Sequence, residues 1–161
     1  MILYQFNCSP LQQGMLYHCA KNEHSGVDIE QLVIDYDENI DADVLARAWK
    51  IASERYAALR TSFSWEGLSS PVQQVHDNVT IPFESQVALD DTSFEAFLRE
   101  DRRRGFNLAR PPLTRLTFFV SEERSSRLVW TLHHILMDGR SFILVLNEVD
   151  GRTVSCLAVL E

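Results

Sequence analysis

Two neighbouring segments that predict a β-hairpin constrain the fold of this chain most strongly. LTRLTFFVSEE (113–123) and SRLVWTLHHIL (126–136) are strand-like runs joined by a polar turn. An earlier segment, IEQLVIDYD (29–37), alternates and is rich in β-branched residues, which also predicts a strand. We therefore expect a β-sheet at the centre of the fold.

Two segments in the first part of the chain predict helices. Ser9 and Gln12 form a capping box at the start of a helix over about 10–20. Asp41 is a suitable N-cap for a second helix within 41–60, where apolar residues recur at helical spacing. This stripe consists of Leu45, Ala48, Trp49, Ala52, Tyr56 and Leu59. Each stripe of this kind needs a core to pack against.

Two more helices are predicted in the second part. In TSFEAFLREDRRRG, Thr92 and Glu95 match a second capping box and Gly105 suits the position after a helix. The segment 141–149 has an amphipathic helical pattern. The residues expected on the buried faces of these two helices are Phe94, Phe97 and Leu98, and Phe142, Val145, Leu146 and Val149.

The order of the predicted elements is α, β, α, β, β, α, β, β, α. The segments 59–66 and 71–77 are short strands, 81–87 is extended at best, and 152–161 is a possible strand. We see no repeat and no linker. This order predicts an α/β (α+β) two-layer sandwich, a mixed sheet with helices packed on it.

Composition excludes several classes of protein. The 161 residues are 45% hydrophobic, which fits one globular domain, and the net charge of −8 argues against nucleic acid as the main partner. Cys8, Cys19 and Cys156 fit neither a disulfide framework nor a zinc site, so we expect reduced cysteines in a cytosolic protein. We find no signal peptide and no apolar run of the roughly 20 residues that span a bilayer.

The segment TLHHILMDGRS (131–141) carries the candidate chemistry. Alternate strand residues share a face, so His133 and His134 are expected to point to opposite sides of the sheet. Asp138 and Gly139 form the turn into the next helix. One imidazole could accept a proton, both could be satisfied core histidines, or the cluster could bind a metal. Adjacent strand residues point apart, which argues against a metal.

Three motifs, in order, resemble the condensation-domain superfamily of nonribosomal peptide synthetases, to which chloramphenicol acetyltransferase is related. HHILMDG (133–139) resembles the family signature HHxxxDG. SPLQQGMLYH (9–18) resembles the first family motif, and ERYAALRTSF (54–63) resembles the second, written RHExLRTxF. The resemblance covers roughly residues 5–149, and it implies the chloramphenicol-acetyltransferase-like fold.

The resemblance implies roles for five residues. His134 matches the catalytic histidine, which deprotonates or orients the attacking amine, and His133 matches a structural one. Asp138 matches an aspartate that holds the loop in shape by pairing with an arginine, and Arg60 matches that arginine. Gly139 matches the glycine that lets the backbone pass close to the reacting carbonyl. We therefore expect a buried pair between Arg60 and Asp138.

The implied activity is acyl transfer that forms amide bonds. The donor and acceptor are thioesters on the phosphopantetheine arms of carrier proteins, which are the expected partners, together with a C-terminal condensation lobe. The implied chemistry needs no metal and no permanently bound cofactor. Composition adds the expectation of no nucleic acid or membrane partner and of a cytoplasmic location. Alternatives are a non-catalytic remnant, a carrier-protein interaction module, or a coenzyme-A-dependent O-acyltransferase.

The sequence departs from the family pattern in two places. Tyr56 and Ala57 stand where the second motif has His and Glu, and we interpret Tyr56 as a packing variant. Condensation domains have two lobes, whereas residues 1–149 match only the N-terminal lobe and 150–161 look like a divergent tail. We expect the C-terminal lobe to be absent and the isolated chain to be inactive.

Overall fold

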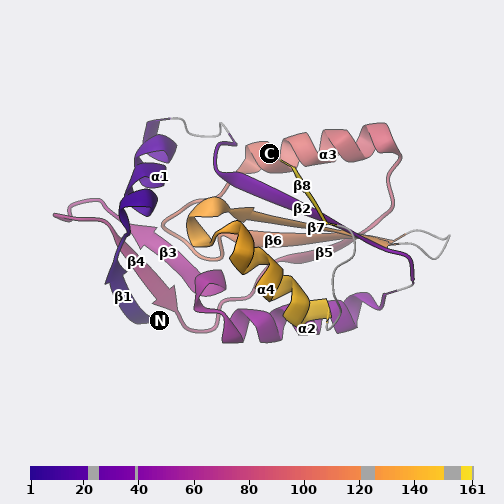
Figure 1. Ribbon diagram of the computed structural model, residues 1–161, viewed down its shortest axis with the longest axis horizontal. Coiled ribbons are helices and arrows are strands. Elements are labelled where there is room, and N and C mark those ends of the chain that lie inside the picture. Colours follow the sequence, from indigo (N-terminus) through magenta and orange to yellow (C-terminus); the bar gives the residue numbers. More distant parts are fainter. Residues whose placement is uncertain (22–25, 39, 121–125, 151–156, 161) are drawn as a thin grey trace.

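The computed structural model describes residues 1–21, 26–38, 40–120, 126–150 and 157–160. It has two sheets and four α-helices among these residues (Figure 1). The helices are α1 (Pro10–Lys21), α2 (Ala42–Arg55), α3 (Asp91–Arg104) and α4 (Gly139–Asp150), and the short 3₁₀ turns are η1 (Ala57–Arg60) and η2 (His134–Leu136). No helix among the described residues is long and apolar enough to cross a membrane.

The larger sheet is mixed, as predicted. Its five strands lie in the order β5-β6-β7-β2-β8; β5 and β6 are parallel, and the other neighbours are antiparallel. The strands are β5 (Phe83–Val87), β6 (Thr114–Val120), β7 (Ser126–His133), β2 (Ile29–Tyr36) and β8 (Leu157–Leu160). The predicted hairpin is the β6–β7 pair, and the possible strand at the end of the chain is β8. The rest of that tail, 151–156 and 161, lies outside the described residues.

A second, three-stranded sheet was not predicted. It is antiparallel, in the order β1-β4-β3, and consists of β1 (Ile2–Asn7), β4 (Val72–His76) and β3 (Thr61–Ser64). Every residue of β1 is exposed, so its sequence lacks the alternation that marks a half-buried strand. Backbone pairing with β4 is what makes this segment a strand.

Local capping explains where the helices begin. The backbone N–H of Ser9 donates to Gln12 Oε1 at 2.9 Å, and the N–H of Gln12 donates to Ser9 Oγ at 3.2 Å, which confirms the capping box of α1. Asp41 caps α2 as predicted. The predicted capping box of α3 is wrong, because Asp90 accepts from the N–H of Ser93 at 2.9 Å and the helix therefore begins earlier.

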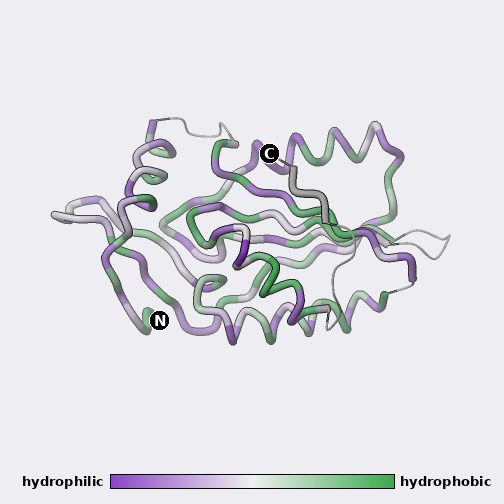
Figure 2. Tube along the Cα trace, viewed as in Figure 1, coloured by the Kyte–Doolittle hydropathy of each residue, from purple (hydrophilic) through white to green (hydrophobic). Residues whose placement is uncertain are grey.

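Helices cover both faces of the larger sheet (Figure 1). On one face, α2 and α4 bury the main core, where the rings of Trp49 and Trp130 lie 4.7 Å apart. On the other face, α3 packs Phe94, Phe97 and Leu98 against the sheet, as expected. Figure 2 shows hydrophobic residues along α4, whereas α3 alternates between hydrophilic and hydrophobic turns. The layers place the end of β7 between α1 and α4.

Candidate active site at the end of strand β7

The end of β7 separates the two histidines, as the strand alternation predicts. Leu128, Trp130 and Leu132 belong to the core cluster on the α2/α4 face, and the ring of His134 continues that face, 6.1 Å from the ring of Phe142 on α4. The ring of His133 points to the other side and contacts α1. The two rings therefore cannot chelate one ion, and they lie in different environments.

His133 is buried, neutral and held at both ring nitrogens. Its Nδ1 accepts a hydrogen bond from the backbone N–H of Ile135 at 3.2 Å, so Nε2 carries the proton and donates to Cys19 Sγ at 3.3 Å. The residue is 2% exposed. Burial, and secondarily the neighbouring His134, lower the pKa of His133 from 6.5 to about 4. Neither nitrogen is free to serve a substrate, which fits a structural role.

His134 has an open side and a closed side. Its backbone N–H donates to the carbonyl of Asp28 at 2.7 Å, and this bond ties the strand end to the residues before β2. Its side chain is 32% exposed, but Nδ1 is buried and has no hydrogen bond. Nε2 is not among the buried unpaired atoms, and it makes no hydrogen bond to a described residue. Nε2 is therefore the ring nitrogen that lies outside the closed side.

Asp138 caps helix α4 and is exposed. Its Oδ1 accepts from the backbone N–H of Ser141 at 3.0 Å and from Ser141 Oγ at 2.8 Å, and the side-chain hydrogen bond is the first cause that lowers the pKa of Asp138. Gly139 opens the helix, and a Cβ added there would meet no atom within 4 Å. The described chain does not itself require glycine at this position, so the substrate-related role of Gly139 stays a prediction.

The expected pair between Arg60 and Asp138 is wrong. Arg60 Nε donates to the carbonyl of Ser53 at 2.7 Å, and its other nitrogens donate to the carbonyls of Glu54 and His76. The last carbonyls of a helix have no partner within the helix, and the guanidinium satisfies two of them at the end of α2. Arg60 thus joins α2 to β4 and does not reach the histidine loop.

The comparisons with known proteins agree on one family. The family model "Condensation domain" matches residues 4–151. The chain belongs to the condensation-domain family. Linear gramicidin synthase subunits D and B of Brevibacillus parabrevis are 41% and 36% identical to this condensation-domain chain over 150 and 149 residues. These matches cover 89% of the chain and 3% of either relative, so the chain spans a small part of their length.

Solved structures support the same fold. The starter condensation domain of rhizomide synthetase RzmA matches with a TM-score of 0.78 at 19% identity, over 91% of this chain and 38% of that chain. The predicted chloramphenicol-acetyltransferase-like fold is confirmed for this condensation-domain chain. At this identity, the likeness concerns the fold alone.

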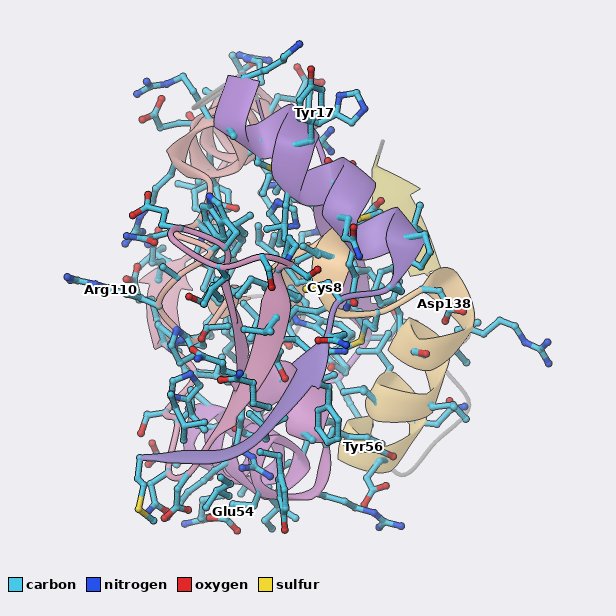
Figure 3. The ribbon with its side chains drawn as sticks, turned by 90° about the vertical axis from the view of Figure 1, so that its left-hand side faces the viewer. Cys8, Tyr17, Glu54, Tyr56, Arg110 and Asp138 are labelled. Atoms are coloured by element: carbon cyan, nitrogen blue, oxygen red, sulfur yellow. The ribbon has the colours of Figure 1, made fainter. Side chains whose placement is uncertain are left out.

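Tyr56, where the sequence departs from the second family motif, has a hydrogen-bond partner on α4. The side chain packs against the main core, as the interpretation of a packing variant requires. Its hydroxyl also donates to Glu148 Oε2 at 2.8 Å, the first cause that raises the pKa of Tyr56, and Arg55 binds the same carboxylate. Figure 3 shows Asp138 and Tyr56 near opposite ends of α4 in this condensation-domain chain. Tyr56 therefore helps to hold α4 beside α2.

Two residues near the histidines were missed in the sequence. Cys19 receives the Nε2–H of His133, and Glu30 on β2 lies beside His134, with its Oε1 3.6 Å from Nδ1. The alternation of 29–37 could have placed Glu30 on one face with Leu32 and Ile34, but it could not say which strand lies opposite. Among the described residues, no group of three or more His, Cys, Asp and Glu side chains is arranged to hold a metal ion.

Proposed function

We propose that this chain contributes the catalytic histidine of an amide-forming acyl transfer in nonribosomal peptide synthesis. The observation that carries the proposal is His134, whose Nδ1 is buried while part of the ring stays exposed at a strand end in a condensation-domain chain. A rigid strand end that presents one open imidazole edge suits a group that accepts or orients a proton.

The proposed substrates are two thioesters on the phosphopantetheine arms of carrier proteins. The α-amine of the acceptor attacks the acyl carbonyl of the donor, a C–N bond forms, and the C–S bond breaks. His134 Nε2 takes or orients the proton of the amine, and the leaving thiolate receives a proton. Positioning supplies about 7–11 kcal/mol of the barrier reduction and the base about 10²–10⁴-fold. We propose that the reaction uses no metal and no resident cofactor.

The other predicted site residues hold the ring in place. His133 fixes the end of β7 through Ile135 and Cys19, and Asp138 fixes the start of α4. Arg60 acts further away, at the junction of α2 and β4. Of this set, only His134 is proposed to touch the reacting atoms, and Gly139 is proposed to let the backbone pass close to the reacting carbonyl.

Activity is proposed to need the rest of the domain. The chain covers 38% of a solved condensation domain that it resembles, so the positioning of two carrier arms needs surfaces beyond these residues. Carrier proteins and a C-terminal condensation lobe are the proposed partners, in the cytoplasm. The 161-residue chain alone is expected to turn over little or no substrate.

Amide formation from two loaded carrier proteins tests this function. We compare the chain alone with the chain supplied with a C-terminal lobe, each as wild type, His134→Ala, and His18→Ala as a matched control on an exposed histidine of α1. With the lobe present, His134→Ala should lose about 10²–10⁴-fold in rate without a change in melting temperature, and His18→Ala should lose nothing.

Other outcomes would replace the proposal. Full activity of His134→Ala would show that His134 takes no part in catalysis. Acyl transfer from coenzyme A to a hydroxyl, without amide formation, would favour the O-acyltransferase. Binding of carrier protein without turnover would favour the interaction module.

A further inference from the structure

The carboxylate of Glu30, one oxygen of which is buried, faces the closed side of His134. Glu30 pairs with Leu132 in the register between β2 and β7, and His134 follows two residues after Leu132, at the start of η2. The distance from Glu30 Oε1 to His134 Nδ1 is 3.6 Å. Glu30 Oε2 and His134 Nδ1 are both buried and have no hydrogen bond.

Two buried unpaired polar groups side by side need an explanation. A buried polar atom without a partner costs about 1–3 kcal/mol, and a proton on Nδ1 directed at Glu30 Oε1 would satisfy this nitrogen and give the carboxylate a hydrogen bond. The 3.6 Å distance is too long for a hydrogen bond, but it is within the range of an ion pair when the ring is protonated.

No other described group competes for this nitrogen. Among the described residues, ionisable residues beside His134 include Glu30 on β2, His133 on β7 and Asp28 before β2. His133 is neutral near pH 7, because burial lowers its pKa to about 4. Asp28 meets His134 through its backbone carbonyl, and α4 presents the apolar ring of Phe142.

We propose that Glu30 is a positioning residue for His134, which holds the imidazole with its proton on Nδ1 and thereby leaves the lone pair of Nε2 facing the substrate. The effect of Glu30 on catalysis rests on the proposed function, whereas the tautomer of His134 does not depend on it. When Nε2 accepts a proton, the carboxylate also stabilises the resulting imidazolium. Glu30 itself transfers no proton in this proposal.

The neighbouring histidine is an internal reference. His133 accepts at Nδ1 and therefore carries its proton on Nε2. The proposal gives His134 the opposite arrangement. Two adjacent histidines at the end of one strand should thus be opposite tautomers, each set by what its Nδ1 meets: a backbone N–H for His133 and a carboxylate for His134.

Nitrogen-15 NMR of the histidine rings tests the tautomers near pH 7.5 in the 161-residue chain, without substrate. We expect a protonated Nδ1 in His134 and a protonated Nε2 in His133. Glu30→Met removes the acceptor but keeps the volume, and it should move the proton of His134 to Nε2. Glu30→Gln can still accept through its amide oxygen and should keep more of the Nδ1–H form than Glu30→Met. Glu84→Met, at an exposed glutamate on β5, should change neither ring.

The activity readout separates positioning from folding. With the C-terminal lobe supplied, Glu30→Met should lower kcat by no more than the about 10²–10⁴-fold that a general base supplies, with KM little changed. Glu30→Gln should restore part of the loss. A merely structural role would lower the melting temperature and leave the ring tautomer and the Gln rescue unexplained.

Failure of this inference differs from failure of the proposed function. A protonated Nε2 in wild-type His134 overturns the inference whatever the activity, and this measurement does not depend on any variant folding. An unchanged tautomer in Glu30→Met overturns it as well. If the tautomers are as expected but His134→Ala is fully active, the positioning by Glu30 stands and the proposed function falls.

Discussion

At the scale of single residues, burial decides what each histidine of the pair can do. His133 has both nitrogens in hydrogen bonds and is almost fully buried, so a second proton has no place without breaking a bond. His134 keeps an exposed edge at the same strand end. The bonds of His133 therefore anchor the strand end from which His134 projects.

The low pKa of His133 predicts how stability depends on pH. The unfolded chain protonates this residue near pH 6.5 and the folded chain only near 4, so protonation favours the unfolded state between these values. The stability that the neutral ring of His133 contributes is fully present above pH 6.5, and it is lost as the pH falls toward 4. Urea unfolding should show a free energy of unfolding about 2 kcal/mol lower at pH 5 than at pH 7 from this residue alone.

Substitution isolates that contribution. His133→Gln should flatten the dependence of the free energy of unfolding between pH 7 and pH 5, whereas His18→Gln, at an exposed position, should leave the slope unchanged. A wild-type chain whose stability is flat across this range would show that His133 is not buried as a neutral ring.

Asp138 predicts a modest effect on stability, because it is an exposed helix cap and not half of a buried ion pair. Loss of one cap in a chain of this length should lower the melting temperature by about 2–4 °C. Asp90→Ala is the matched control, since Asp90 caps α3 through Ser93 with the same pattern of bonds. If Asp138→Ala melted far below Asp90→Ala, Asp138 would have a tertiary partner that its capping role does not supply.

At the scale of elements, a buried polar network fastens α3 to the larger sheet. Asp101 Oδ1 accepts from Arg115 Nε at 2.5 Å, and Oδ2 accepts from Gln31 at 2.9 Å and Thr131 at 2.6 Å. Arg115 also binds the carbonyl of Gly105 at 2.8 Å, just after α3 ends. The carboxylate thus joins α3 to three strands, β2, β6 and β7.

Removing the Asp101 carboxylate from this network should lower the stability of the fold substantially. Asp101→Ala leaves the Arg115 guanidinium buried and unpaired, and the free energy of unfolding should fall by about 3–5 kcal/mol in a urea titration. Glu95→Ala is the control on the same helix, because its pair with Arg99 is exposed and contributes little.

The double variant Asp101→Leu, Arg115→Met tests the physical reason. With neither charge left buried, it should lose less stability than Asp101→Ala. A double variant as damaged as the single one would mean that the hydrogen bonds to Gln31 and Thr131, and not the unpaired charge, dominate the cost.

At the scale of the whole molecule, the layers bring together residues that are far apart in the chain. Helix α1 covers His133 on one side of β7, and β2 and α4 surround His134 on the other. The main core between α2, α4 and the sheet keeps these elements in register, and Tyr56 adds a polar bond between the two helices. The candidate site is therefore a product of three separate contacts with one strand end.

The sequence by itself determined the local features. Strand alternation placed His133 and His134 on opposite faces, and the Ser9–Gln12 box and the Asp41 cap marked helix starts, because these patterns depend on residues within four positions of each other. The three family motifs identified the fold. The cap of α3 was missed by two residues because Asp90, Asp91 and Thr92 all resemble caps, and only the backbone selects one.

Only the tertiary structure decided the partners. Glu30 beside His134, Cys19 against His133, and Arg60 on the carbonyls of α2 and β4 depend on which segments pair across many residues of chain. The sequences of the exposed strand β1 and the parallel strand β5 gave only weak strand signals, because these strands also depend on pairing with distant segments. A side chain's own sequence neighbours fix its direction from the backbone, but the free energy of burying it is set by whatever the fold brings opposite.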